Sequence, residues 1–481
     1  MHRLRGSRLL IVLFLLSLPV ITTRIYASDE IQYFSFLRSL WFDHDLKFDN
    51  EYRYFEDHYF HDRGAPAPAG FAETYLADTT PTGYRKTYAT IGCAILWAPF
   101  YAVGDITARV MHASGRPVAV DGYSPPYVAA VCYGSACYGF AALLISAAIV
   151  RRWMGASLAA TLAIWFGTPL FFYMYLAPVF AHACEAFSVA LLLWAWLNAR
   201  DRWTPRSAML MAAAAALAAM VREQELIFVV APAADFAWFA FRQASRGSKV
   251  PGSQGAQRSV GQLAWTAVTA CVAFAVVYLP QAAAYIVVNG RLKASGEVTR
   301  KMTWTSPHFF QVLFDPQHGL FVWTPMAVLA VAGLVGLTAD ARIAPPGRRT
   351  TPRALALCAF ALTLLNVYIA GCIESWTAAG AFGQRRFVSL TPVLVIGLAA
   401  LFGWVARRTT IMKVSTAAVA ILCIWWNAGL MAQFGLNTMN RLELSPIQNA
   451  RVTFVTLPLD APKLAWRYFT DRQSFYNLPK Q

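Results

Sequence analysis

Charged residues are scarce in this chain. Asp, Glu, Lys and Arg make up only 14% of its 481 residues, whereas 57% are apolar. Soluble domains carry charge on about a quarter of their residues, so this composition excludes an ordinary soluble protein. It predicts a polytopic membrane protein of the all-α class.

Cysteine motifs and a nucleic-acid signature are also missing. Most of the eight cysteines fall inside apolar segments, and no spacing between them resembles a metal site or a disulfide framework. We interpret them as small core residues. The net charge of +16 would suggest nucleic acid in a soluble protein. Here Lys and Arg gather in short loops on one side, so no nucleic-acid partner is expected.

Apolar segments follow one another almost continuously and predict about 11 transmembrane helices, since a crossing takes about 20 residues. The expected spans lie near residues 9–23, 127–149, 155–176, 179–198, 207–221, 226–241, 261–288, 321–339, 354–372, 387–405 and 412–430. They form one membrane-embedded domain, residues 1–430. A long first outer loop covers residues 24–126, and a short outer tail covers residues 431–481.

Residues 88–103 decide the topology, because 16 residues are short for a span. If they stay at the interface, the cytoplasmic segments hold nineteen basic and two acidic residues, whereas the first outer loop holds nine basic and thirteen acidic ones. If they crossed, sixteen of the nineteen basic residues would lie outside. The positive-inside rule therefore favours eleven spans, a cytoplasmic N-terminus and a periplasmic C-terminus. Residues 31–41 have the apolar spacing of a second interfacial helix.

Two adjacent carboxylates, Asp29 and Glu30, follow the first apolar segment. If that segment spans a bilayer, they lie at the outer water–lipid boundary, where ionisable groups are costly and are retained mainly for function. Alternatively, they begin a solvated loop. The N-terminal segment also suits a secretory signal cleaved after Ala27, although we favour an uncleaved first helix.

Polar side chains from five outer connections gather at the outer leaflet in this topology. They are Asp29, Glu30 and Lys86, then His182 and Glu185, then Arg222, then His318, and finally Trp376, Arg385 and Arg386. A carboxylate can take a proton from a hydroxyl nucleophile, and Arg and Lys can hold a departing phosphate. The combination suits a polar acceptor and a phosphate-bearing lipid.

Simpler interpretations are available for several of these groups. His182 could be a hydrogen-bonded histidine between helices, and Arg222 could form a local ion pair with the adjacent Glu223. The stretch Asp315-Pro-Gln-His-Gly319 could be a plain turn, since Asp-Pro and His-Gly favour turns.

Four sequence features, taken with this layout, carry a family resemblance. They are the Asp29-Glu30 pair, the helix-like segment 88–103, Val221-Arg222-Glu223, and the loop Trp376-Thr-Ala-Ala-Gly-Ala-Phe-Gly-Gln-Arg385-Arg386-Phe387. Together they resemble the GT-C superfamily of integral membrane glycosyltransferases, which use polyprenyl-phosphate-linked sugars. The style is closest to bacterial members grouped with the dolichyl-phosphate-mannose protein mannosyltransferases and the aminoarabinose transferases. Lys86-Thr-Tyr-Ala stands where many members have a His- or Lys-Pro-Pro motif.

The resemblance implies an inverting glycosyltransferase at the outer face of the bacterial inner membrane. The acceptor would be a lipid, a glycan or a protein, and membrane lipids would surround the site. Asp29 would act as general base with Glu30 as its partner, or the pair would hold a divalent cation such as Mg²⁺ or Mn²⁺. Its implied donor-phosphate ligands are Lys86, Arg222, Arg385 and Arg386, and its implied sugar or acceptor pocket residues are His182, Glu185, Trp376 and His318.

Three other functions stay open at this stage. A lipid transporter or flippase predicts ionisable residues inside several spans and repeat symmetry, whereas these spans hold almost no charge apart from Asp235. A polysaccharide polymerase or ligase would place its chemistry in a large late outer loop, for which residues 289–320, with His308 and His318, are a candidate. A structural or receptor role is the third.

Overall fold

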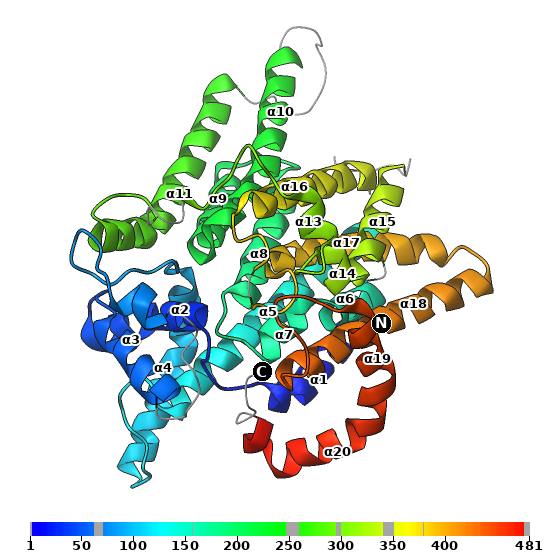
Figure 1. The fold of residues 1–481 in the computed structure, drawn as a ribbon. Coiled ribbons are helices and arrows are strands. Elements are labelled where there is room, and N and C mark those ends of the chain that lie inside the picture. Colours follow the sequence, from blue (N-terminus) through cyan, green and yellow to red (C-terminus); the bar gives the residue numbers. More distant parts are fainter. Residues whose placement is uncertain are drawn as a thin grey trace.

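The computed structural model describes residues 2–61, 71–155, 157–246, 259–294, 300–339, 351–378 and 380–475 (Figure 1). Within these ranges the chain is helical, and its only β-type pairings are two isolated bridges, Thr79 with Arg85 and Met302 with Ile373. The α-helices are α1 His2–Ser17, α2 Ser28–Arg38, α3 Asp49–Phe55, α4 Gly92–Ala113, α5 Pro125–Met154, α6 Leu158–Gly167, α7 Pro169–Tyr175, α8 His182–Ala199, α9 Pro205–Val221, α10 Val230–Arg246, α11 Val260–Asn289, α13 Phe309–Phe314, α14 Leu320–Trp323, α15 Met326–Thr338, α16 Pro352–Cys372, α17 Thr391–Val405, α18 Thr410–Gly435, α19 Pro446–Arg451 and α20 Leu457–Thr470.

Short 3₁₀ and π segments extend or connect several of these helices. The 3₁₀ segments are η1 Leu18–Val20, η5 Glu223–Val229, η6 Arg385–Leu390 and η8 Arg472–Phe475, and the π segments are η2 Ser39–Asp43, η3 Glu56–His61, η4 Ala72–Leu76 and η7 Val452–Thr456. Two of them, η5 and η6, lie at the starts of the predicted spans 226–241 and 387–405. The first turns of these spans are therefore 3₁₀ and not α-helical.

Several helices are long and apolar enough to cross a membrane. In the described part of the chain, six stretches meet this condition: Pro125–Met154, Glu223–Gln243, Val260–Asn289, Pro352–Cys372, Arg385–Val405 and Thr410–Gly435. A seventh is the pair α6 and α7, which is bent by 70° at a short break. The four remaining predicted spans contain α1, α8, α9 and α15. The membrane class is thus supported, whereas the count of eleven stays a prediction.

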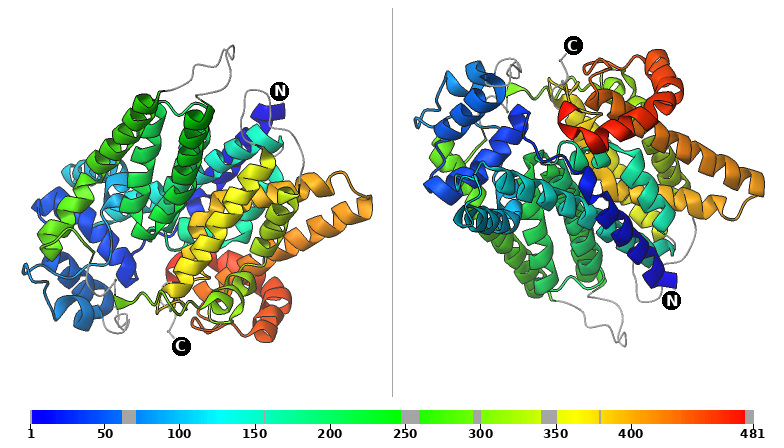
Figure 2. Two further views of the ribbon diagram at one scale, coloured as in Figure 1. Left: turned by 90° about the horizontal axis from the view of Figure 1, so that it is seen from above. Right: turned by 90° about the horizontal axis from the view of Figure 1, so that it is seen from below.

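The connections fall on two sides of the helix bundle (Figure 2). The N-terminus, the end of α10, the start of α11 and the turn from α17 to α18 lie on one side. The first-loop helices, α19 and α20 lie on the other. This arrangement agrees with the predicted topology, and the side that faces the cytoplasm stays a prediction.

The first loop folds into a helical unit beside the bundle. Helix α2 includes most of the predicted segment 31–41, but Ile31, Phe34 and Phe36 are buried by the rest of the protein, unlike a helix that rests on lipid. Helix α4 is longer than predicted, because its regular hydrogen bonding continues through Asp105 and Arg109, which form an ion pair at 3.0 Å.

The extended stretch 87–91 is held between three helices. Gln32 Oε1 of α2 accepts a hydrogen bond from the Tyr88 amide at 2.7 Å, and Gln281 Oε1 of α11 accepts one from the Ile91 amide at 2.9 Å. Thr90 Oγ1 donates to the Val221 carbonyl at the end of α9 at 2.8 Å. These bonds join the first loop to the bundle where the candidate site lies.

Proline and hydroxyl caps set the starts of the long helices. Thr204 and Thr351 accept hydrogen bonds from backbone amides at the starts of α9 and α16, and proline follows each of them. Ser259 and Gln262 form a reciprocal capping box at the start of α11. Proline tolerates the first helical turn because its missing amide would lack a partner there anyway, and a hydroxyl cap satisfies another free amide.

Helices α15 and α17 cross at two glycines. A Cβ atom on Gly333 would lie 1.9 Å from the Gly397 carbonyl oxygen, and one on Gly397 would lie 2.1 Å from the Ala330 carbonyl oxygen. Small residues let helix backbones approach closely, which drives packing between helices in lipid. The bundle here is therefore held by backbone contact.

We expect Gly397→Ala to destabilise the protein by about 1–3 kcal/mol, the usual cost of overpacking, because the new methyl group meets backbone that cannot turn aside. Gly403, on the same helix, has nothing within 4 Å of its would-be Cβ. Gly403→Ala is the matched control and should be neutral or stabilising by up to about 1 kcal/mol, the helix preference of Ala over Gly. Thermal unfolding in detergent measures both. Equal effects would contradict the close crossing.

Candidate active site

A cavity of about 870 Å³ lies where the first loop meets α9, η5, α11 and α16. Its lining residues are Asp29, Gln32, Tyr33, Tyr88, Ala89, Thr90, Arg222, Glu223, Gln224, Leu226, Ile227, Tyr278, Tyr285, Leu292, Lys293, Ala294, Met302, Trp304, Ile369, Ile373 and Arg386. Part of this wall is charged, with Asp29, Arg222 and Arg386 close together. The rest is largely apolar or aromatic, and comes from α2, residues 88–89, η5, α11, residues 292–294, Met302, Trp304 and the end of α16.

Asp29 reaches the cavity from the first turn of α2 and pairs with Arg385 from η6. The Arg385 Nη1 to Asp29 Oδ2 distance is 2.6 Å, and the two side chains are 20% and 37% exposed. Burial by itself would raise the pKa of the Asp29 carboxyl, but the Arg385 guanidinium outweighs it, so the pKa is lowered. Asp29 is therefore a carboxylate near neutral pH.

Glu30 has a different environment although it is the next residue. Its Oε2 accepts hydrogen bonds from the amides of Tyr26 and Ala27, at 3.0 and 3.1 Å, which is the glutamate half of a capping box at the start of α2. The side chain is fully buried. Burial raises the pKa of the Glu30 carboxyl to about 8, against backbone hydrogen bonds that lower it. In this position Glu30 holds the helix start, and it does not line the cavity.

His182, Glu185 and Arg222 form a hydrogen-bonded triad, in which the His182 and Glu185 side chains are buried and Arg222 is 20% exposed. Glu185 Oε2 lies 2.8 Å from His182 Nδ1 and accepts a hydrogen bond from Arg222 Nη1 at 3.0 Å. The other carboxylate oxygen, Oε1, accepts from the Ser389 amide at 3.2 Å. The triad joins α8, the end of α9 and η6. Arg222 thus turns to Glu185 and not to its neighbour Glu223, whose Oε1 accepts a hydrogen bond from the Tyr285 hydroxyl.

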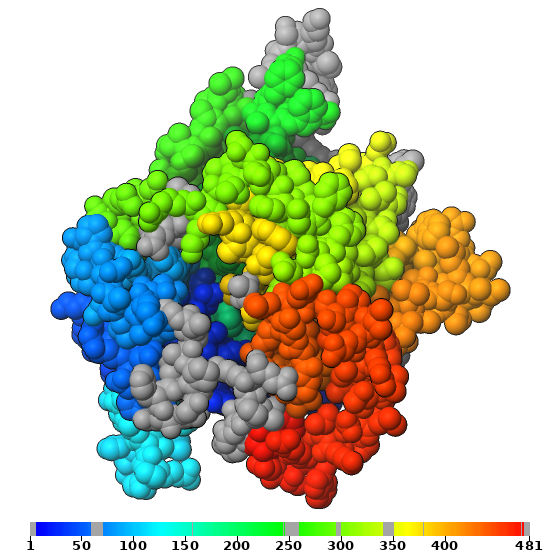
Figure 3. All heavy atoms as spheres, viewed as in Figure 1, coloured from blue at the N-terminus to red at the C-terminus, as the bar shows by residue number. Residues whose placement is uncertain are grey.

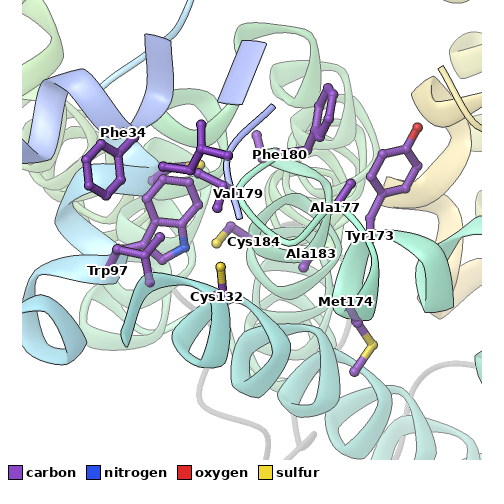
Figure 4. Packing of buried hydrophobic residues seen from close by; sticks show 14 of the residues in the cluster. Phe34, Trp97, Cys132, Tyr173, Met174, Ala177, Val179, Phe180, Ala183 and Cys184 are labelled. Atoms are coloured by element: carbon purple, nitrogen blue, oxygen red, sulfur yellow. The ribbon is translucent and has the colours of Figure 1, made fainter. Parts of the chain in front are cut away.

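Buried aromatic residues pack beside this triad, and Figure 4 shows two of them, Tyr173 and Phe180. The Tyr173 ring contacts the His182 ring edge-on, with centroids 4.4 Å apart, and the Tyr173 hydroxyl donates to the Phe382 carbonyl at 3.0 Å. The Phe180 ring lies 5.5 Å from the Arg385 guanidinium carbon. Beneath them, Cys132 and Cys184 belong to the buried core. Five of the eight cysteines are buried and all eight are free thiols, as core residues would be.

Arg386 fixes the loop that contains Trp376. Its Nη1 donates to the Trp376 carbonyl and its Nη2 to Ser375 Oγ, both at 3.2 Å. Gln384 Nε2 donates to the same Trp376 carbonyl at 2.9 Å, and the Trp376 ring stacks on His308 at 5.6 Å. Arg386 also lines the cavity, whereas Trp376 does not.

Two further predicted site residues lie outside the cavity wall. Lys86 Nζ pairs with Asp78 Oδ2 at 3.0 Å and is not part of the cavity wall. His318 is fully buried, stacks on Trp323 at 4.6 Å, and its Nε2 lies 2.7 Å from the Ala381 carbonyl oxygen. Burial lowers the pKa of His318 to about 4. His318 therefore stabilises the 376–387 loop from below and does not face the cavity.

Of the predicted site residues, Asp29, Arg222 and Arg386 line the cavity, and its other lining residues were not predicted. Four of these carry polar groups that bear on its chemistry. They are Tyr33, Glu223, Tyr285 and Lys293. Tyr33 lies one helical turn after Asp29 on α2, so helical spacing was a usable signal for it. The sequence suggested Glu223 only as an ion-pair partner of Arg222. Lys293 follows the end of a predicted span, where contact with lipid headgroups was the simpler interpretation.

The two adjacent carboxylates do not fit a shared cation site as they lie. Asp29 Oδ2 faces Arg385, and Glu30 Oε2 faces backbone amides. Among the described residues, no group of three His, Cys, Asp or Glu side chains is placed to hold a metal ion. A divalent cation therefore stays a prediction, and no step below depends on one.

Comparison of the chain with protein-family models, with curated proteins and with solved structures finds no match. The site must be interpreted from its own geometry.

We expect Glu30→Gln to change how stability depends on pH while keeping the fold, because a capping box accepts Gln at this position. With a pKa raised from 4.5 to about 8, folded Glu30 keeps a proton that the unfolded chain loses. Its contribution to stability is full below pH 4.5 and is lost as pH rises to about 8. The variant, which has no proton to lose, should gain stability relative to the wild type across this window.

Thermal unfolding in detergent at both ends of the window measures this difference. Glu73→Gln, at an exposed position in η4, is the control and should follow the wild type. A Glu30→Gln curve parallel to that of the wild type would show that Glu30 is not held protonated.

Proposed function

We propose that the protein is an integral membrane glycosyltransferase that moves a sugar from a polyprenyl-phosphate donor to a hydroxyl acceptor. The observation that carries this proposal is the composition of one cavity. It joins a carboxylate, Asp29, and two guanidinium groups, Arg222 and Arg386, to a wall of apolar and aromatic side chains. A phosphate with a long apolar tail needs both kinds of surface.

The proposed chemistry is a single displacement with inversion. The acceptor hydroxyl oxygen bonds to the anomeric carbon while the bond from that carbon to the phosphate oxygen breaks. Its electron pair leaves with the polyprenyl phosphate, and Asp29 takes the hydroxyl proton. Arg222 and Arg386 stabilise the charge on the departing phosphate, and Lys293, also in the cavity wall, adds a third cation.

Each remaining polar residue has a supporting role in this proposal. Arg385 holds Asp29 in place and keeps it ionised, and Glu185 with His182 orients Arg222. The rings of Tyr33, Tyr88 and Tyr285 line the cavity and provide surfaces on which a sugar can pack. Glu30, Lys86 and His318 act only on the architecture.

We further propose that the chain has eleven spans and lies in the bacterial inner membrane with the cavity at the outer face. The acceptor is a lipid, a glycan or a protein. The rival polymerase or ligase is less well supported, because His318 is buried and His308 Nδ1 lies 3.1 Å from the Gly371 carbonyl oxygen. The transporter is less well supported because two acidic residues within predicted spans are paired, Asp235 with Arg200 at 2.7 Å and Glu185 with Arg222 at 3.0 Å.

We expect Asp29→Asn to lower turnover of a polyprenyl-phosphate sugar about 10²- to 10⁴-fold, the usual contribution of a general base, while donor binding persists. Radiolabelled donors from a panel of sugars, added to purified protein, measure both quantities. Glu30→Gln is the matched control and should keep its turnover. An Asp29→Asn variant with most of its activity would overturn the base assignment.

Two further outcomes of the same assay are informative. If a chelator alone abolished wild-type turnover, metal binding would become the better explanation for Asp29 and Glu30. No binding of any lipid-linked sugar by the wild type would remove the transferase and favour a transporter.

We expect Arg385→Gln to move the acid limb of the pH profile of kcat/KM to higher pH. Without the Arg385 guanidinium, the largest effect that lowers the pKa of Asp29 is gone, and burial raises this pKa, so the base is protonated over a wider acidic range. Lys86→Gln, at a residue paired with Asp78 outside the cavity, is the control and should leave the limb in place. A pH profile of kcat/KM that is unchanged by Arg385→Gln would contradict the assignment of Asp29 as the general base.

A further inference from the structure

The chain after α18 folds back against the bundle and forms a continuous outer surface (Figures 1 and 3). This segment consists of α19, η7 and α20, and we call it the C-terminal arm. It is docked through polar side chains. Gln433 Nε2 of α18 donates to Thr453 Oγ1 at 2.9 Å, and Asn449 Nδ2 donates to Gln433 Oε1 at 2.8 Å. All three side chains are buried.

The backbone contact beneath these bonds is close. A Cβ atom on Gly429 would lie 2.3 Å from Thr453 Cγ2, and Trp425 Nε1 donates to the Thr453 carbonyl at 3.0 Å. The orientation of the arm is therefore well determined by its contacts with α18.

The opposite side of the arm exposes large apolar side chains. Ile447, Leu459, Trp466 and Phe469 are 89%, 74%, 73% and 84% exposed, and no residue of α20 is buried. Leu459, Trp466 and Phe469 share one helical face because they are seven and three residues apart. Two exposed basic residues, Arg451 and Lys463, lie on the same arm.

This pattern is unlike that of a segment that faces water: polar side chains of α19 and η7 are buried against α18, and large apolar side chains of α19 and α20 are exposed. A soluble tail would expose the amides and bury the rings. A helix with exposed Trp, Phe and Leu beside Lys is the form that inserts into the boundary between headgroups and acyl chains. We propose that the C-terminal arm is an interfacial anchor, with its apolar face in the outer lipid leaflet.

The position of the arm along the membrane normal agrees with contact to the lipid headgroup region. Arg472, just after α20, donates from Nη1 to the Pro19 carbonyl at 2.9 Å and from Nη2 to the Ile21 carbonyl at 2.7 Å. Pro19 and Ile21 lie at the end of the first predicted span, where the chain leaves the apolar layer. The eight residues beyond Ile21 lead directly to Asp29. The arm thus also sets the depth of the candidate site relative to the lipid surface.

The experiment uses the full chain in liposomes of phosphatidylethanolamine and phosphatidylglycerol. A benzophenone amino acid replaces Leu459, Trp466 or Phe469, and in the control it replaces Asp460, which lies on another side of α20 by helical spacing. After illumination, mass spectrometry detects adducts. We expect lipid adducts when the probe is at Leu459, Trp466 or Phe469, and no lipid adduct when it is at position 460.

A second variant keeps the test independent of catalysis. With the probe at Trp466, the paired changes Leu459→Glu and Phe469→Glu should abolish the lipid adduct, because charged groups avoid this depth, while size-exclusion chromatography confirms a folded protein. Absence of lipid adducts at all three positions would overturn the proposal. So would a cross-linked dimer in liposomes, or an adduct with another protein when the cross-link is made in cells, since either would mean that protein covers this face.

Discussion

The pairing of buried charge is the constraint on which the rest of this structure depends. Opposite charges attract strongly where water is scarce, and an unpaired charge there is costly. Asp29 therefore needs Arg385, 356 residues away, and Glu185 needs Arg222, while His182 lies within hydrogen-bonding distance of the same carboxylate. Because the partners come from different helices, satisfying each charge brings the first loop, α8, α9 and η6 to one place. The cavity lies beside this meeting point, where the first loop also faces η5, α11 and α16.

The helical class and the position of most helices could be predicted from the sequence, because hydropathy and the sidedness of Lys and Arg are local properties. The same topology correctly brought Asp29, Arg222 and Arg386 together, since it placed them at the outer ends of spans. Lys86 and His318 could not be placed this way. Lys86 lies in a loop, and its side chain points to Asp78 of the same loop. Hydropathy does not predict the path of a loop. His318 has a backbone φ of 81°, and this conformation turns its ring into the core.

Asp29 and Glu30 show why residue type alone does not assign a role. Both are carboxylates in the first turn of α2, yet they differ by about 100° around the helix. One meets a guanidinium beside the cavity, and the other meets the free amides of its own helix start. Sequence adjacency made them look like a pair with a common task. The helix separates them into a charged group open to the cavity and a buried acid that holds the helix in place.

The ion pair between Asp29 and Arg385 also has a consequence for how the protein is made. Because the ribosome adds about 5–20 residues per second, the 356 residues between the partners take roughly 20 to 70 s to synthesise. During that interval α2 has left the ribosome while its guanidinium partner does not yet exist. The hydrogen bonds from the Tyr26 and Ala27 amides to Glu30 are local and can form at once. The Asp29 side chain is fixed only when Arg385, in the second half of the chain, has been made. The helix start is thus an early folding event, and the cavity is a late one.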